Sequence, residues 1–185
     1  VGEAPTPPGV VYRSDIPPAE RRAFFGELHL HTVMSFDAWI FGSKVKPDQA
    51  YRFARGEEVG LPPYDEAGVP SRTLALERPL DFVALSDHAE FLGLVTTCQN
   101  EAFEGYDSPQ CKSYRETPVP AFITLNAAVA APQGSAKGAE PCTTANGNCA
   151  SAAMGAWREV QEAAAAENDT TSACTFTTFV AYEWS

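Results

Sequence analysis

The chain has 185 residues, of which 44% are hydrophobic, and its 24 acidic and 13 basic side chains leave a formal net charge of −11. A surface of this charge repels nucleic acid and anionic membranes, so we expect neither as a partner. The hydrophobic content suffices for one core, and no run of residues approaches the ~20 apolar residues of a membrane-spanning helix. A small anionic substrate is not excluded, because bound metal ions reverse the local field.

The N-terminal segment, residues 1–22, predicts an extended arm, because proline fixes φ and has no backbone N–H to donate. Its prolines are Pro5, Pro7, Pro8, Pro17 and Pro18. The remaining residues, 23–185, predict an α/β domain.

The first strand is expected over residues 23–31. Its last four residues, Leu28-His29-Leu30-His31, alternate strictly between apolar and histidine, so both histidines project from the same face of a strand. A helix is expected to follow over residues 47–55. Pro47 suits its first position and Gly56 suits the position after its end.

The second strand is expected over residues 80–86, after an irregular segment with short strands over residues 57–78. Its unbroken apolar run is typical of a strand that is buried on both faces of a parallel sheet. The run ends abruptly in the polar residues Ser86-Asp87-His88-Ala89-Glu90. A helix is expected soon afterwards, over residues 91–98.

A cysteine-containing insertion is expected at about residues 99–150. Most of it, residues 105–150, is rich in Pro, Gly, Ser, Thr and Asn and predicts a long loop. Residues 152–167 then predict a helix, and the third strand is expected over residues 175–184. Apolar residues recur in that helix at helical spacing, at Met154, Trp157, Val160 and Ala164. Strands that alternate with helices favour a parallel α/β architecture.

The five cysteines allow two interpretations, namely disulfide bonds in an exported protein or free thiols in a cytosolic one. Cysteines in long polar loops are typical of the first, and the absence of a C-x-x-C pair argues against a zinc ribbon. Cys142 and Cys149 are close enough in sequence to close a small loop. Cys98 with Cys111 is the natural second pair, and Cys174 is left over.

All three histidines of the chain fall at the expected carboxyl ends of strands, as His29-x-His31 and as His88. Two histidines spaced by two on a strand project side by side, which suits two imidazoles on one metal ion. A single histidine in such a position is as well explained by a structural role. The placement of every histidine of the chain at a strand end therefore favours metal binding.

Four acidic residues accompany the histidines, and each has a second interpretation. Asp37 is either a ligand or a loop residue that caps a helix, and Glu183 is either a metal ligand or part of a buried ion pair. Asp87 and Glu90 are the candidate catalytic residues. Asp87 faces away from His88 on a strand, so we expect it to accept a hydrogen bond from a ligand imidazole. Glu90 is a ligand, a proton-transfer group or a helix-start acid.

The combination of motifs resembles the PHP superfamily, the polymerase and histidinol phosphatase group. The resemblance is carried, in order, by His29-Leu30-His31-Thr32 with Ser35 and Asp37, by Leu85-Ser86-Asp87-His88, and by Tyr182-Glu183. The longer runs 25–32 and 79–90 are similar to an exported bacterial branch that is catalogued as a domain of unknown function. The resemblance covers most of residues 23–98 and 152–185, and leaves the arm and the insertion unexplained.

This resemblance implies the N-terminal part of a distorted (β/α)7 barrel with two or three divalent ions, Zn, Mn or Fe, at its strand ends. It implies that His29 and His31 bind one ion, that Glu183 bridges it to a second, and that Asp37 joins His88 on a third. The family takes further ligands from later strands, including histidines. No histidine follows His88, so those ligands would come from a further part of the same protein or from another chain.

The function that we expect is metal-dependent hydrolysis of a small phosphate ester in a periplasmic or secreted bacterial protein. Lys44, Lys46 and Arg52 are the basic side chains considered for the phosphate, and nothing in the sequence selects among them. One alternative is an amidohydrolase-like enzyme that acts on an amide or a lactone, since His-x-His on a first barrel strand also occurs there. The other is a non-catalytic module that binds metal or a partner through the insertion.

Overall fold

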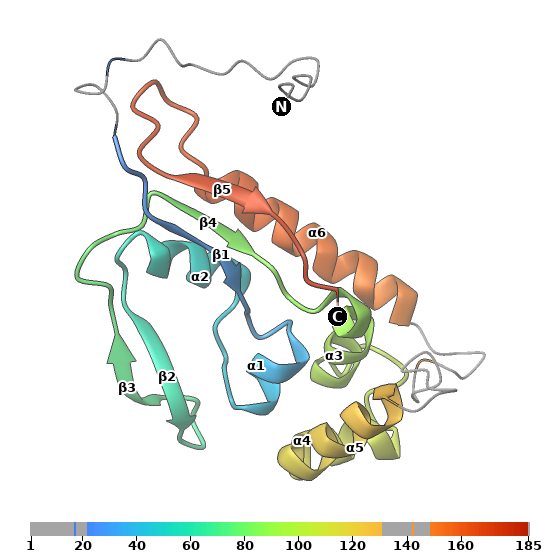
Figure 1. The fold of residues 1–185 in the computed structure, drawn as a ribbon. Helices are drawn as coiled ribbons and strands as arrows, with labels where there is room; N and C mark the ends of the chain where they lie inside the picture. The colour runs from blue at the N-terminus through green and yellow to red at the C-terminus, as the bar shows by residue number, and fades with distance from the viewer. Residues whose placement is uncertain (1–16, 18–21, 131–141, 143–148, 185) are drawn as a thin grey trace, which may run out of the picture.

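The computed structural model describes residue 17, residues 22–130, residue 142 and residues 149–184. Nearly all of the expected N-terminal arm lies outside the described residues. The described elements form an α/β fold with a small parallel sheet and helices (Figure 1). The α/β class is thus confirmed, whereas no barrel is closed within the described part of the chain.

Three parallel strands form the sheet, in the order β1 (Gly26–Leu30), β4 (Phe82–Leu85) and β5 (Thr177–Val180). Strand β5 is shorter than the expected 175–184, because the central strand β4 offers only four residues for pairing. Beyond the regular sheet, a single parallel bridge joins His88 to Glu183. The pairing of β1 with β4 shifts between Glu27 and Leu30, just where the first histidine lies.

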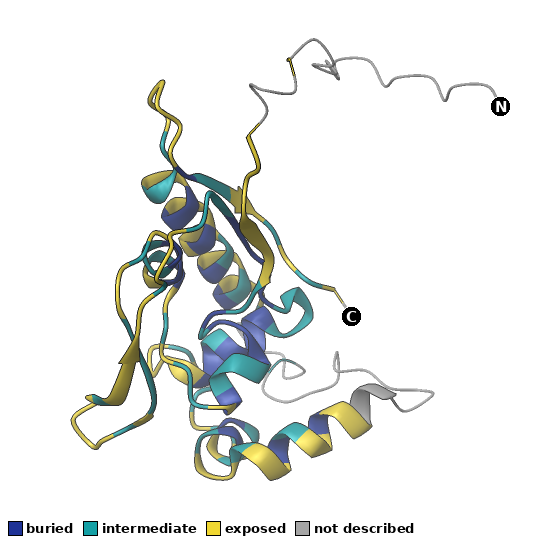
Figure 2. Cartoon of the chain, turned by 60° about the vertical axis from the view of Figure 1, so that its left-hand side comes forward, coloured by how far each residue is buried: buried dark blue, intermediate teal, exposed yellow. Residues whose placement is uncertain are grey.

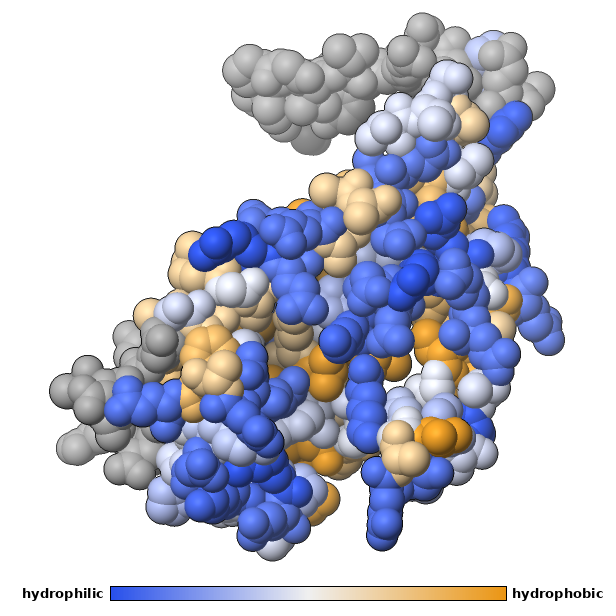
Figure 3. Space-filling model, turned by 180° about the vertical axis from the view of Figure 1, so that it is seen from behind, coloured by the Kyte–Doolittle hydropathy of each residue, from blue (hydrophilic) through white to orange (hydrophobic). Residues whose placement is uncertain are grey.

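Two helices cover one face of this sheet, α2 (Pro47–Ala54) and α6 (Cys149–Glu167). Their small side chains pack against the apolar side chains of β4, together with Tyr51 and Phe176. Arg158, Glu159 and Glu162 are exposed on α6, and the molecule is mainly hydrophilic when seen from behind the sheet (Figure 3). The expected helix 152–167 is confirmed, but the assignment of Met154 to its apolar face is wrong, since Met154 is exposed.

Strand β1 is exposed along most of its length (Figure 2). Both β1 and β5 include exposed apolar residues. The exposed large apolar residues of these strands and the segments beside them are Phe24, Phe25, Leu28, Phe179, Val180, Tyr182 and Trp184. The central strand is mostly buried, as its unbroken apolar run predicted. Leu28 is exposed although Leu28-His29-Leu30-His31 alternates strictly, so alternation in the sequence did not distinguish a covered face from an open one.

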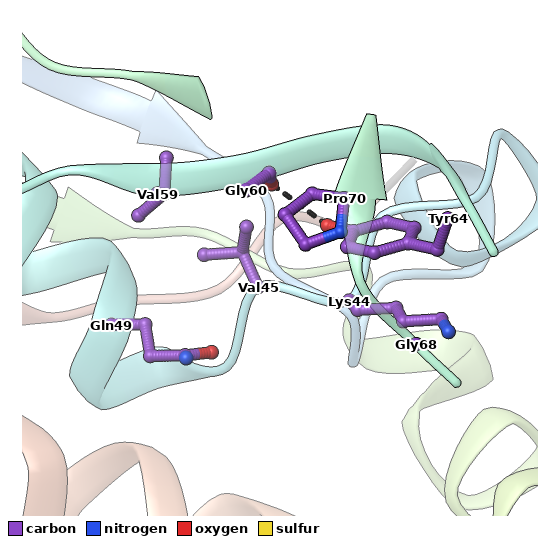
Figure 4. A pocket seen from close by; sticks show the side chains of 8 residues that line it. All are labelled: Lys44, Val45, Gln49, Val59, Gly60, Tyr64, Gly68 and Pro70. Atoms are coloured by element: carbon purple, nitrogen blue, oxygen red, sulfur yellow. Dashed lines mark hydrogen bonds between the residues drawn. The ribbon is translucent and has the colours of Figure 1, made fainter. Parts of the chain in front are cut away.

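The expected irregular segment 57–78 contains an antiparallel hairpin, β2 (Val59–Tyr64) and β3 (Pro70–Leu74), that projects from the sheet (Figure 1). A cavity of about 230 Å³ lies between this hairpin and the segment before α2 (Figure 4). The hydroxyl of Tyr64 donates to the carbonyl of Gly60 at 2.7 Å. A side chain on Gly60 would come within 2.7 Å of Pro70, so this close approach requires glycine.

The expectation of a long loop over 105–150 is wrong for residues 109–130, which form α4 (Pro109–Glu116) and α5 (Pro118–Ala130). Proline suits the first position of both helices, and the side chain of Ser108 caps α4 by accepting from the N–H of Cys111. Proline is also common in loops, which is why the sequence favoured a loop here. The expected helix 91–98 is confirmed as η2 (Ala89–Phe91) followed by α3 (Leu92–Gln99).

A second core joins these helices to the short helix α1 (Phe36–Ile40), which follows β1. Phe36 lies at its centre and is 2% exposed. The disulfide bond Cys98–Cys111 ties α3 to α4 inside this core, and Cys142–Cys149 lies at the start of α6. Both are the expected pairs, and Cys174 is exposed and forms no disulfide. No described helix combines the length and the apolar character that a membrane span requires.

Candidate metal centre

The three strand ends bring histidine and carboxylate side chains to one place, as their positions in the sequence predicted. The backbone N–H of Glu183 donates to the carbonyl of Asp87 at 3.1 Å, and the N–H of Ala89 donates to the carbonyl of Glu183 at 3.0 Å. This pair of bonds continues the pairing of β4 with β5 past the regular strands. It therefore holds Glu183 beside His88 and opposite the histidines of β1.

His29, His31 and Glu183 point at a common centre. Nε2 of His29 lies 2.8 Å from Oε2 of Glu183, Nε2 of His31 lies 2.9 Å from the same oxygen, and the two Nε2 atoms are 3.1 Å apart. Ligand atoms about 2.0–2.1 Å from a tetrahedral zinc ion are separated by about 3.3 Å. The two imidazoles and the carboxylate are therefore a donor set, at nearly the right spacing, for one divalent ion.

Asp37 contacts the opposite side of the His31 ring. Its Oδ2 and Oδ1 lie 2.9 and 3.1 Å from Nδ1 of His31, and its Oδ1 also accepts from the N–H of Ala38. Burial raises the pKa of Asp37, but hydrogen bonds from Ser35, His31 and Ala38 outweigh it, and the pKa lies below its ordinary value. The ionised carboxylate keeps a proton on Nδ1, which leaves Nε2 as the lone-pair nitrogen.

A second group of possible ligands consists of His31, Asp37 and His88, whose ligand atoms lie no more than 4.8 Å apart. This group competes with the first for His31, since a neutral imidazole has only one lone-pair nitrogen. The contact between Asp37 and Nδ1 favours the first group. In this geometry Asp37 orients His31, whereas the resemblance implied that Asp37 binds an ion directly together with His88.

His88 lies beside the first group rather than inside it. Its Nε2 is 3.8 Å from Oε2 of Glu183, and its ring centroid is 4.9 Å from that of His31. Its Nδ1 lies 3.2 Å from Oε1 of Glu90, and the Glu90 side chain is only 12% exposed. Glu90 thus faces the histidine cluster from the first turn after β4, and is not simply a surface acid at a helix start.

The hydrogen-bond partner of the Asp87 side chain differs from the imidazole that was expected. Its side chain is 5% exposed and accepts from the backbone N–H of Thr32 at 2.5 Å and from the Thr32 hydroxyl at 2.8 Å, and within the described residues these are its hydrogen bonds. Burial raises the pKa of Asp87, although the bonds from Thr32 act against the rise. Asp87 therefore fixes the end of the His29-x-His31 segment through the backbone, not through an imidazole.

Glu183 is less buried than its apolar neighbours in sequence suggested, since its side chain is 27% exposed. Burial raises its pKa, but the hydrogen bond from His29 and the charges of His88, His29 and His31 outweigh it and lower the pKa. Positive charge at the histidines therefore stabilises the ionised form of the Glu183 carboxylate. A proton on an imidazole or a divalent ion both satisfy this arrangement.

Two buried hydroxyl residues were named in the first motif, but no role was predicted for them. Thr32 and Ser35 are each 0% exposed, and the Ser35 hydroxyl accepts from the backbone N–H of His88 at 3.3 Å. Their position in the sequence, between His31 and Asp37, is the feature that points to a role. A polar side chain that is buried next to a site needs a hydrogen-bond partner there. Of the basic side chains considered for the phosphate, Lys44 lies over the ring of Tyr64 and Arg52 pairs with Asp48.

Comparisons with known proteins identify one family. Neither a curated protein nor a solved structure matches the chain. The family that matches residues 18–185 is described as a protein of unknown function, DUF3604. This match agrees with the expected resemblance to a catalogued domain of unknown function, while membership of the PHP superfamily stays a prediction. Because the match covers nearly the whole chain, the chain belongs to the DUF3604 family.

Proposed function

We propose that the protein is a metal-dependent hydrolase, and that its substrate is a small phosphate ester. The observation that carries this proposal is the convergence of His29, His31 and Glu183 from two strand ends, with three ligand atoms 2.8–3.1 Å apart. Bringing these polar side chains together costs free energy unless they bind something, and a hydrolytic metal centre explains why they are together. The motif resemblance to the PHP superfamily supports phosphate esters over other substrates.

In this proposal the residues of the site have different roles. His29, His31 and Glu183 would hold the ion, and Asp37 keeps the Nδ1 proton of His31 in place. When bound, a divalent ion such as Zn, Mn or Fe lowers the pKa of a water molecule and offsets charge that develops on a phosphoryl group. Glu90, close to His88 and largely buried, is the candidate for proton transfer.

The complete site needs more than these residues, because two or three ions require more ligands than the described strand ends supply. We infer that a further part of the same protein provides them and completes a barrel of the PHP type. The two disulfide bonds support a periplasmic or secreted location. The net charge of −11 supports a small-molecule substrate over nucleic acid or membrane lipid.

The test combines metal analysis with an assay of the full-length protein on phosphomonoesters and phosphodiesters, with Zn, Mn or Fe supplied. We expect turnover with at least one metal. Glu183→Gln, which keeps the shape of the side chain but loses its charge, should weaken metal binding about 100-fold or more and abolish turnover. The matched control is Glu66→Gln, which changes an exposed acid on the β2–β3 hairpin and should leave both unchanged.

The possible outcomes of this test distinguish the candidate functions. Turnover of an amide or a lactone, with none of any phosphate ester, would assign the site to the amidohydrolase-like class. Metal uptake without any turnover would make the protein a binding module. If the purified protein takes up no divalent ion, or if Glu183→Gln takes up as much as the native protein, the proposal is wrong.

A further inference from the structure

A cavity of about 240 Å³ opens beside the candidate metal centre. One side of it is polar and is formed by Asp37, His88 and Glu90. The other side is aromatic and is formed by Phe36, Phe91 and Phe122, with Asn126 also lining it. The cavity thus connects groups of the candidate centre to an apolar wall.

Three separate elements build the aromatic wall. Phe36 belongs to α1, Phe91 ends η2, and Phe122 belongs to α5 of the insertion. The rings of Phe36 and Phe122 are nearly parallel, at 20°, with centroids 5.9 Å apart, and the rings of Phe36 and Phe91 are 5.5 Å apart. Phe36 packs into the second core, so the wall has a rigid base, whereas Phe91 and Phe122 are only partly buried.

We propose that this cavity binds a planar apolar group, such as an aromatic ring, on the substrate that is hydrolysed at the neighbouring metal centre. The inference rests on the proposed function and adds the class of substrate to it. A ring fits the space, since an apolar cavity of about 150 Å³ holds one benzene molecule. Stacked or edge-to-face contact with the phenylalanine rings would stabilise it further.

Charge sets the direction in which such a substrate enters. The carboxylates of Asp37 and Glu90 stand at the polar side of the cavity and repel a phosphate group. The apolar end of the ester therefore lies against Phe36, Phe91 and Phe122, and its phosphate stays at the neighbouring ion held by His29, His31 and Glu183. Because Phe122 lies on α5, the insertion selects the substrate while the strand ends carry the chemistry.

The experiment compares benzyl phosphate with ethyl phosphate, which both release a primary alcohol and differ in the ring. We expect the full-length, metal-loaded protein to show a kcat/KM for benzyl phosphate about tenfold or more above that for ethyl phosphate. Phe122→Ala should lower this ratio about tenfold, through a higher KM for the benzyl ester. Ile123→Ala, at the exposed neighbouring position on α5, is the matched control and should keep the native ratio.

A second readout separates failure of the cavity from failure of the chemistry. Benzylphosphonate and ethylphosphonate, which are not hydrolysed, are titrated into the same metal-loaded proteins, and their dissociation constants are compared. Tighter binding of the benzyl compound that Phe122→Ala removes supports the cavity, even if no ester is turned over and the proposed hydrolysis is wrong. Equal affinities for the two phosphonates would overturn the inference, whatever the turnover.

A second variant, Phe122→Trp, distinguishes loss of the cavity from unfolding of α5 in Phe122→Ala. The larger ring fills the cavity instead of emptying it, so it should exclude the benzyl group while α5 stays packed. A native benzyl-to-ethyl ratio in Phe122→Trp would contradict the inference.

Discussion

His31 has two nitrogens in two different environments, and this difference organises the candidate centre. Nδ1 faces the Asp37 carboxylate at 2.9 Å, and Nε2 faces Glu183 and His29 at 2.9 and 3.1 Å. A carboxylate on one nitrogen makes the other a better ligand, because it fixes the tautomer and raises the basicity of the ring. In the proposed metal centre, Asp37 would therefore act on the ion through His31.

This role predicts the behaviour of Asp37→Asn. The amide removes the charge that holds the Nδ1 proton, so we expect the affinity for Zn or Mn to fall about 10- to 100-fold. The number of ions bound at saturation should not change. Titration against a competing chelator measures both quantities, and Asp48→Asn, at an exposed acid paired with Arg52, is the control. A loss of one bound ion per chain would instead make Asp37 a direct ligand.

The described helices of the insertion are a packed part of the fold. Helices α4 and α5 share a core with α1 and α3, and residues of α5 reach the cavity beside the candidate metal centre. Cys98 and Cys111 are both 0% exposed within that core. The disulfide bond between them therefore restricts the unfolded chain and also joins α3 to the helix that precedes α5.

Removing this bond tests how much it stabilises the domain. We expect the double variant Cys98→Ala, Cys111→Ala to lower the free energy of unfolding by about 3 kcal/mol, the value for a closed loop of similar length. Urea unfolding under oxidising conditions measures it. Cys174→Ala, at an exposed cysteine outside both disulfides, should change it by less than about 0.5 kcal/mol. Equal midpoints for the double variant and the native protein would refute the expectation.

The whole molecule combines strong negative charge with exposed apolar side chains. The net charge is −11 and the isoelectric point is about 4.6. Leu28, Phe179, Tyr182 and Trp184 are each at least 46% exposed, and they lie on or next to the outer strands of the sheet. Charge repulsion keeps molecules apart at neutral pH, whereas these side chains favour contact once the repulsion is lost.

Association of this chain should therefore depend on pH. Protonation of carboxylates brings the net charge toward zero as the pH falls from 7 to about 4.6, so we expect light scattering to rise over this interval. Concentrated NaCl at pH 7 screens the same charges and should act in the same direction. Scattering that stays flat through the isoelectric point would show that the apolar side chains do not support association.

Local patterns in the sequence predicted much of the fold and the members of the site. The apolar run of β4, the helix of residues 152–167 and the pairing of Cys98 with Cys111 are confirmed. The alternation in His29-x-His31 correctly placed both imidazoles side by side, with their Nε2 atoms 3.1 Å apart. The helices at 109–130 were missed because their prolines and polar residues suit a loop as well as a helix start.

By itself, the sequence determined which side chains stand at the strand ends, because the period of a strand and the direction of parallel strands follow from local chemistry. Only the tertiary structure decided what each of them contacts. The partner of Asp87 is Thr32, 55 residues away, and Asp37 faces His31 while Glu90 faces His88. The aromatic wall likewise joins three elements. Such pairings depend on how distant segments pack, and no local period encodes that.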